Sequence, residues 1–447
     1  MKFQALWAAM MWAAVAVFAG GPEAGAQADP DDTGPAIDRT VKAEIIDSVT
    51  AALDRYYVFP DVAKKMGEHA RRQLKKGAYD TLATVGTFAR GLSEDLLTVC
   101  HDRHFGLRYV PRAQLEAMLD TINRPTAAEE LRRARLDNFG FRKAEQLPGN
   151  VGYLKLDGFS GLPEARATAV GAMHFLAHTD ALIIDLRDNG GGSPDMIQIL
   201  TSYFFKDQVH LNTFYVRETD SLQQFWTTSY VDGEKMADVP LYVLTSGGTF
   251  SAAEEFTYNL KNLKRATVVG ETTGGGAHPV ATHGFPNLEV GVRVPFGRAI
   301  NPISGTNWEG TGIAPDIACA ADRALEVALL EAYRKLKAEC GDEQLLATYD
   351  WQIDGLEAQR NPVTLEAAAL QEYVGDFGPR RIALENGALV YQREGNPKFR
   401  MTPMGGDLFM FADIPYFRLK FVRDAGGGIV AVEGHYEGGQ VDRNERT

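Results

Sequence analysis

Apolar positions near the start of the chain repeat with a helical period. Ile45, Val49, Leu53 and Tyr56 recur every three or four residues, which places them on one face of a helix. We therefore expect residues 37–110 to begin as an N-terminal helical domain. Three further elements are expected in this block: helices over 62–76 and 81–98, and a strand over 107–110.

Between residues 150 and 338, short apolar strands alternate with helical patterns. Residues 181–186 (ALIIDL) are apolar almost throughout, as in a strand that is buried on both faces of a sheet. Such alternation is typical of an α/β domain with mostly parallel strands. The expected strands are 151–156, 181–186, 241–245, 266–271 and 288–295, and the expected helices are 163–178, 194–205, 251–263 and 322–337.

The remaining segments have other patterns. Residues 111–149 are polar and charge-rich, which favours a covering helix and linker, and they are too few for an inserted peptide-binding domain of ordinary size. Residues 365–447 switch to strand alternation around Asn386-Gly387, a strong hairpin signal. We expect a small C-terminal antiparallel β domain there, joined by a linker around 341–364.

The first 28 residues have the pattern of a secretory signal peptide. Lys2 gives a basic start, the apolar run 6–18 is too short to span a bilayer, and small-x-small cleavage sites lie within 24–28. No later run is apolar enough for a transmembrane helix. The pattern predicts export of the mature protein, with a bacterial periplasm as the preferred compartment.

Charge and cysteine content narrow the possible partners. The formal net charge is −13 and there is no basic tract, so nucleic acid is not an expected partner. Three cysteines, Cys100, Cys319 and Cys340, do not make a disulfide framework. In an oxidising compartment, Cys319 and Cys340 could pair.

One serine marks a junction between an apolar strand and a helix, in the segment 245–256 (TSGGTFSAAEEF). Gly247 and Gly248 permit a sharp turn just before Ser251. A serine in such a turn has its hydroxyl at the open end of a sheet, where acyl-transfer enzymes place a nucleophile. The alternative is that Ser251 or Thr249 is only a helix N-cap.

A glycine-rich turn follows the apolar strand 181–186. Gly190, Gly191 and Gly192 allow successive N–H groups to point one way, as in a nest that holds an oxyanion or a phosphate. The phosphate motifs GxxxxGK[ST] and GxGxxG are absent. The alternative is a plain turn in which Asp185 and Arg187 form a structural ion pair.

Several histidines are candidates for the base that a nucleophile needs. His101 and His104 flank Asp102 at a helix-to-strand turn, and a metal site there lacks an obvious third ligand. His278 and His283 lie in a later glycine-rich loop. We expect no metal.

A carboxylate partner is offered by Glu309. It lies in the loop 307–316 (NWEGTGIAPD), whose glycines and proline also fit a simple turn. The loop carries Trp308 beside the carboxylate, and a bare turn would need neither.

Taken together, these segments resemble the tail-specific or C-terminal processing serine peptidase family. The likeness is closest to the branch that contains the tricorn core protease and interphotoreceptor retinoid-binding protein modules, whose N-terminal region resembles the block ending in DRHF. The resemblance implies a crotonase-like ββα core. The matching segments, in family order within residues 150–320, are VGYLKLDGF, ALIIDLRDNGGG, TSGGTFSAAEEF, VVGETTGGGA and WEGTGIAPDI.

The resemblance also implies roles for individual residues. Ser251 would be the nucleophile. The oxyanion hole would combine the N–H of Ala252 with a glycine of the 189–192 turn, Gly191 or its neighbour Gly190. No metal or nucleotide cofactor is implied.

The base differs from that of the processing proteases. Their catalytic lysine aligns with Gly276 here, so the resemblance to the tricorn-like branch assigns the base to His104, with Glu309 orienting or polarising the site. The residue before this histidine is often small or hydroxylic in the family and is Arg103 here, so another group must orient the base.

We therefore expect an exported serine peptidase that cleaves peptide or protein substrates through a Ser–His acyl-enzyme mechanism. The PDZ module typical of the family is missing from the pattern. Two alternatives use the same fold: a non-catalytic binding module for apolar ligands, and an esterase-type acyl hydrolase.

Overall fold

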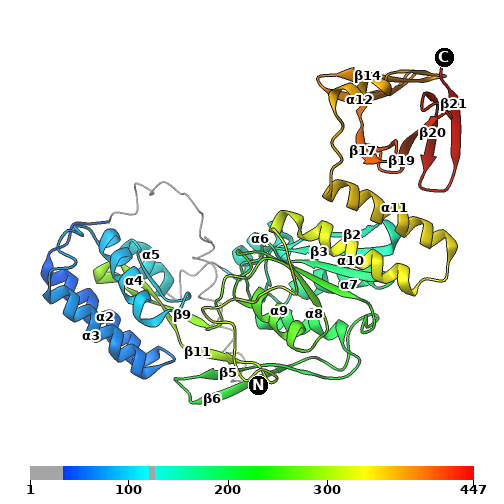
Figure 1. The fold of residues 1–447 in the computed structure, drawn as a ribbon. Coiled ribbons are helices and arrows are strands. Elements are labelled where there is room, and N and C mark those ends of the chain that lie inside the picture. The colour runs from blue at the N-terminus through cyan, green and yellow to red at the C-terminus, as the bar shows by residue number, and fades with distance from the viewer. Residues whose placement is uncertain (1–33, 120–125) are drawn as a thin grey trace. The chain divides into compact units, whose positions relative to one another are not determined.

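The computed structural model describes residues 34–119 and 126–447, so the predicted signal peptide lies outside the described residues. The chain divides into two compact units, and each is considered by itself (Figure 1). The first unit contains the described residues up to Gln146 together with Gly152–Leu325, and the second contains Leu147–Val151 and Glu326–Thr447. The finer domain boundaries expected from the sequence stay a prediction.

The N-terminal block consists of helices that share a core with strands from much later in the chain. The apolar faces of the helices pack around Phe88 and against Val290, Val292 and Val294. These valines lie on the middle strand of a three-stranded sheet with the order β1-β10-β9. The elements are α2 (Arg39–Tyr56), α3 (Pro60–Lys75), α4 (Val85–Cys100), β1 (Gly106–Tyr109), β9 (Val280–Phe285) and β10 (Val290–Pro295).

A six-stranded sheet with the order β12-β8-β7-β4-β3-β2 forms the centre of the first unit. Its strands β12, β8, β7 and β4 pair in parallel, and β4 and β7 are buried along their whole length, as expected for strands covered on both faces. The strands are β2 (Phe141–Leu147), β3 (Val151–Leu156), β4 (Ala181–Asp185), β7 (Leu241–Thr245), β8 (Thr267–Gly270) and β12 (Ile317–Ala318). The helices of this part are α7 (Ala165–Leu176), α8 (Pro194–Thr201) and α9 (Ala252–Asn262). The mixed α/β class predicted from the sequence is confirmed, with N-terminal helices and several sheets.

The structure differs from the sequence prediction in several segments, among them residues 280–285, where the expected loop around His283 is the strand β9. The segment 111–149 contains α5 (Arg112–Leu119) and α6 (Ala127–Leu136), and it also supplies the edge strand β2, whose mostly polar residues hid it. A second three-stranded sheet, β11-β5-β6, was not predicted. The predicted linker around 341–364 is instead largely the helix α11 (Glu343–Arg360), whose apolar residues do not gather on one face. The new strands are β5 (His210–Val216), β6 (Ser221–Trp226) and β11 (Gly297–Ile300).

The second unit contains the expected antiparallel strands in two sheets around an aromatic-rich core. The predicted Asn386-Gly387 turn is confirmed: Glu385 pairs with Ala388, and both turn residues have positive φ, as a type I′ hairpin requires. The helices are α10 (Ala324–Glu339), α11 and α12 (Ala367–Glu372). The strands are β13 (Gly375–Phe377), β14 (Arg380–Glu385), β15 (Ala388–Arg393), β16 (Lys398–Arg400), β17 (Thr402–Gly405), β18 (Leu408–Met410), β19 (Phe417–Arg423), β20 (Ile429–Tyr436) and β21 (Val441–Glu445).

Two further expectations concern cysteines and membrane helices. Cys100, Cys319 and Cys340 are present as thiols, so the possible Cys319–Cys340 disulfide is not formed. Among the described residues, no helix has the length and apolar character needed to cross a bilayer.

The shared core of the N-terminal helices leads to a stability prediction. Phe88 is fully buried, so Phe88→Ala should lower the free energy of unfolding by about 3–5 kcal/mol through lost burial and a residual cavity. Urea unfolding followed by circular dichroism measures the change. Phe175→Ala is the matched control, because Phe175 is 59 % exposed and its loss should change stability by less than about 1 kcal/mol. Equal effects of the two substitutions would contradict the packing described here.

Candidate active site

Ser251 lies at the junction of β7 and α9, as the sequence predicts. Its backbone has φ 54° and ψ −119°, a conformation rarely adopted by a residue with a side chain. Its N–H donates to Glu254 Oε2 at 2.9 Å, which is one half of a capping box. Ser251 therefore occupies the N-cap position of α9 and also stands in a strained strand-to-helix turn, so the two alternatives from the sequence are not exclusive.

Glu254 ties this turn to the glycine-rich loop after β8. Its fully buried carboxylate accepts hydrogen bonds from the Thr273 hydroxyl at 2.5 Å, from Gly275 N at 2.7 Å and from Gly276 N at 2.8 Å, besides Ser251 N. Burial raises the pKa of Glu254 above its usual value, although these donors favour the charged form. One side chain thus fixes the serine and the 273–276 loop in a single arrangement.

His104 follows α4 and reaches the same place from the N-terminal block. Its ring packs on Phe250 with 4.7 Å between centroids. A Cβ atom at Gly276 would lie 2.5 Å from His104 Cε1 and 2.2 Å from Phe250 Cζ. The imidazole therefore fills the space directly beside the backbone of Gly276.

Ser251 and His104 line one cavity of about 360 Å³, although they are 147 positions apart in the sequence. The walls are mainly apolar and include Phe159, Phe214, Phe225, Val280 and Trp308. The structure thus brings the predicted nucleophile and base to one mainly apolar cavity.

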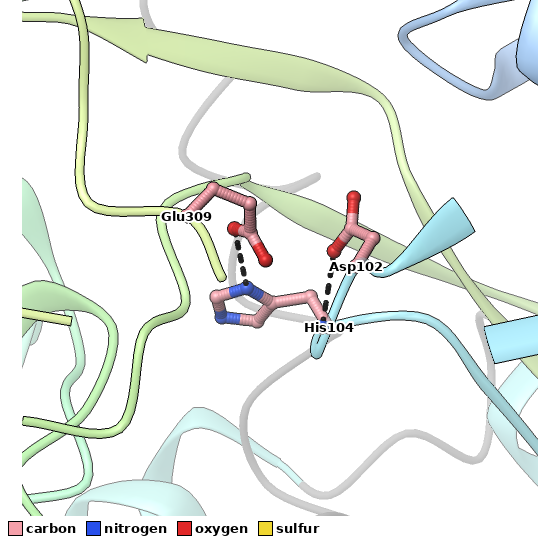
Figure 2. A group of neighbouring side chains, drawn as sticks. All are labelled: Asp102, His104 and Glu309. Atoms are coloured by element: carbon pink, nitrogen blue, oxygen red, sulfur yellow. Dashed lines mark hydrogen bonds and ion pairs between the residues drawn. The ribbon is translucent and has the colours of Figure 1, made fainter. Parts of the chain in front are cut away.

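Glu309 lies beside the ring of His104 (Figure 2). Its Oε2 is 3.9 Å from His104 Nδ1, an ion-pair distance rather than a hydrogen bond, and that Nδ1 is buried without a hydrogen-bond partner. The same oxygen accepts from Ala277 N at 2.5 Å, and Oε1 accepts from Arg103 N at 3.2 Å. Burial acts to raise the pKa of Glu309, but His104, the charge of His278 and the Ala277 N–H outweigh it and lower the pKa below its usual value.

Asp102 holds the backbone of the histidine rather than its ring. Its Oδ1 accepts from His104 N at 3.1 Å (Figure 2), and its Oδ2 accepts from His278 Nδ1 at 2.7 Å and from the Tyr57 hydroxyl at 3.3 Å. His278 Nδ1 also lies 3.6 Å from Glu309 Oε2, so this histidine stands between the two carboxylates. Sequence reasoning missed the Asp102–His278 pair, since its partners are 176 positions apart and nothing in their local patterns links them.

The predicted oxyanion donors lie next to the serine. Ala252 is the first residue of α9, so its N–H has no acceptor within the helix. Gly191 has φ 114°, and a Cβ there would lie 2.8 Å from Ser251 Cβ and 3.0 Å from Ala252 N. The Gly191 N–H, however, donates to Asn189 Oδ1 at 2.9 Å, whereas the space beside neighbouring Gly190 is open.

Two family models match this chain. Residues 150–319 match the model of peptidase family S41, and residues 38–137 match the model described as the N-terminal domain of peptidase S41 in eukaryotic IRBP. The chain belongs to peptidase family S41. The matched ranges contain the S41 segments with Ser251 and Glu309 and the N-terminal segment with His104.

Named relatives of this S41 chain are processing proteases. It is 30 % identical over 183 residues to carboxyl-terminal-processing peptidase 2, chloroplastic, of Arabidopsis thaliana, and 30 % identical over 206 residues to the carboxy-terminal-processing protease of Bartonella bacilliformis. The matches cover 38 % and 45 % of this chain, but only 33 % and 44 % of those proteins. A solved structure of the photosystem II D1 C-terminal processing protease matches with a TM-score of 0.41 at 16 % identity, over 63 % of this chain and 93 % of that one.

Three ligand atoms from Asp102, His104 and Glu309 lie within 4.8 Å of one another, close enough for a metal ion. The oxygen atoms of both carboxylates already accept hydrogen bonds from backbone N–H groups, and Asp102 also accepts from His278 and Tyr57. The S41 site therefore uses these acids to hold two histidines, and its donor set does not favour a metal.

Glu255 follows Glu254 but lies in a different environment. It lines the cavity, is 3 % exposed, and accepts a hydrogen bond from Asn212 Nδ2 at 3.2 Å. No ion pair to Glu255 is formed within residues 34–119 and 126–447. Burial raises its pKa to about 7.

The close contacts at Gly276 predict the effect of a single methyl group. Gly276→Ala should displace the ring of His104 or of Phe250 and lower kcat/KM by about 10²-fold for any reaction in which His104 is the base, because small displacements of a base are costly. The matched control is Gly171→Ala in α7, where a Cβ meets nothing within 4 Å and activity should stay unchanged. Unaltered activity of Gly276→Ala would show that His104 does not depend on this space.

The environment of Glu255 predicts a dependence of stability on pH. Its folded pKa, about 7, is above the usual 4.5, so rising pH between these values ionises the unfolded state first and lowers stability. Glu255→Gln removes this penalty and should be more stable than the wild type by about 3 kcal/mol at pH 8, with the difference vanishing near pH 4. Urea unfolding at both pH values measures it, with the exposed Glu44→Gln as control. A variant less stable than the wild type at pH 8 would contradict the buried, unpaired state of Glu255.

Proposed function

We propose that this chain is a serine peptidase that hydrolyses peptide bonds through an acyl-enzyme. The observation that carries the proposal is the meeting of Ser251 and His104 in one cavity beside the N-terminus of α9. Family membership and the names of the relatives support it. A nucleophile next to a base, with free N–H groups alongside, is the arrangement that acyl transfer needs.

In this proposal each group of the site has one role. His104 takes the proton of the Ser251 hydroxyl as its oxygen attacks the substrate carbonyl, and later returns that proton to the leaving amine. The N–H of Ala252, with an N–H of Gly191 or Gly190, stabilises the tetrahedral oxyanion. Gly191 is the glycine that lies beside Ser251, and its N–H must leave Asn189 Oδ1 to take part. Water then hydrolyses the acyl-enzyme. His104 takes a proton from the attacking water and returns it to the Ser251 oxygen as the acyl group leaves.

Glu309 orients or polarises the base, since the residue before the histidine is Arg103 here and is often small or hydroxylic in the family. Its carboxylate lies next to His104 Nδ1 and stabilises the imidazolium that forms during the reaction. Arg103 is committed elsewhere, because its guanidinium donates to Gly274 O at 2.6 Å. Asp102 acts indirectly: it positions the base by holding the backbone of His104 and the ring of His278.

The finer expectations form part of the same proposal. The parallel sheet with its covering helices is a crotonase-like core of residues 150–338, preceded by the helical block 37–110 and the cap 111–149, and followed by the β domain 365–447. Substrates are peptides or proteins, with no nucleic acid involved. The protein is exported across the inner membrane and works in the periplasm.

A fluorophosphonate probe tests the nucleophile. Wild-type protein should label at one serine, Ser251→Ala should not label, and His104→Ala should label at least about 10³-fold more slowly, since the serine is then not activated. Gel fluorescence and mass spectrometry of the labelled peptide identify the site.

Two controls make this experiment decisive. Ser221→Ala and His174→Ala remove an exposed serine and an exposed histidine and should label like the wild type. Circular dichroism confirms that each variant is folded. A folded wild type that does not label would favour the alternative of a binding module for apolar ligands, and labelling without peptide cleavage would favour the esterase.

A further inference from the structure

Glu255 is an unusual group to find in the wall of an apolar cavity. It is one turn of helix beyond Ser251, and its N–H donates to Ser251 O at 2.9 Å. Its side chain lines the same cavity as the nucleophile, among Phe214, Phe225 and Trp308. A carboxyl group in such surroundings needs a partner when it is charged.

Its neighbour Glu254 has a structural role, and the hydrogen bonds of the two acids differ. Glu254 is equally buried but receives four hydrogen bonds from the serine turn and the 273–276 loop. Glu255 receives one at 3.2 Å from the amide of Asn212, and the amide of Asn259 is the other group that favours its charged form. The protein therefore surrounds one of the two adjacent acids with four donors, and among the described residues it gives the other, in the cavity, only side-chain amides and no cation.

We propose that Glu255 is the counter-ion for a long basic side chain of the substrate, and that the peptidase cleaves after lysine or arginine. The proposal rests on the serine peptidase function above. The aliphatic stem of such a side chain packs on the aromatic walls, and its cation meets the carboxylate at the end. The net charge of −13 favours the approach of basic peptides.

Other ionisable groups also line the cavity and belong in any account of its pH dependence. His104 and His278 lie on the wall beside the nucleophile, and Glu130 and Arg133 of α6 stand at exposed positions of the lining. From β5 and α9, the side chains of Asn212 and Asn259 lie near Glu255, and neither is ionisable. His104 must be neutral for either kind of substrate, so a comparison of two substrates cancels its titration.

The test compares two substrates that differ only in charge. Acetyl-Ala-Ala-Lys-aminomethylcoumarin and its norleucine counterpart have side chains of similar length. In the wild type, the lysine substrate should have the higher kcat/KM at pH 8, by about 10-fold or more, and this ratio should fall toward 1 at pH 5.5 as Glu255 takes up a proton. A ratio of 1 or less at pH 8 would overturn the proposal.

Variants assign the preference to Glu255. Glu255→Gln keeps the shape and the hydrogen bond to Asn212, and should lower the lysine-to-norleucine ratio by about 30-fold or more, as loss of one partner of a buried charge pair does. Glu44→Gln removes the same charge from the exposed face of α2 and should leave the ratio unchanged. An unchanged ratio in Glu255→Gln would assign any preference for lysine to another group and overturn the proposal.

A binding measurement separates this inference from the proposed function. Ser251→Ala cannot form an acyl-enzyme, so fluorescence anisotropy with dye-labelled Ala-Ala-Lys and Ala-Ala-norleucine peptides reports recognition alone. Preference of Ser251→Ala for the lysine peptide, together with a folded wild type that does not label with fluorophosphonate, would refute catalysis and keep the recognition site. Labelling of Ser251 without any preference for lysine would keep the peptidase and refute the role of Glu255.

Discussion

The site depends on the buried carboxylate of Glu254. Its hydrogen bonds join the N–H of Ser251 to the loop that carries Thr273, Gly275 and Gly276. A buried donor without an acceptor costs more free energy than a hydrogen bond contributes. Each of these N–H and O–H groups therefore stays bound to the carboxylate. The strained backbone of Ser251 is stable only within such an over-determined arrangement.

From this loop the arrangement extends to the base. The residues after Gly276 direct the N–H groups of Ala277 and His278 at Glu309, and Glu309 in turn lies beside His104. The histidine itself arrives on the segment between α4 and β1. That segment is positioned by packing of the N-terminal helices on β10, and by pairing of β1 with the same strand. The packing that stabilises the N-terminal core therefore also positions His104.

Two adjacent acids in α9 show how environment divides roles. Glu254 and Glu255 have the same chemistry and nearly the same burial, yet one is surrounded by backbone N–H and hydroxyl donors and the other by aromatic rings and side-chain amides. Hydrogen-bond donors favour the charged form of a carboxyl group, and apolar walls disfavour it. Two adjacent acids can therefore have different roles when their surroundings differ. The cost of keeping Glu255 in the cavity falls on stability, which is common where a site is prepared for a ligand.

Local features of this protein could be read from the sequence. The helical faces around Leu53, the buried strands β4 and β7, the Asn386-Gly387 hairpin and the position of Ser251 between strand and helix follow from periodicity and turn chemistry, which act over a few residues. The polar edge strand β2 and the helix α11 were missed because their patterns do not show which face is buried.

Only the tertiary structure decided which distant groups meet. The contact of Asp102 with His278, the space that His104 takes beside Gly276, and the sheet containing β5 that places Asn212 next to Glu255 all join segments far apart in the chain. No local pattern encodes such pairs, since they depend on the path of the backbone and on how the cores pack. The sequence by itself determined that Ser251 stands between a strand and a helix, and the packing of the chain decided what surrounds it.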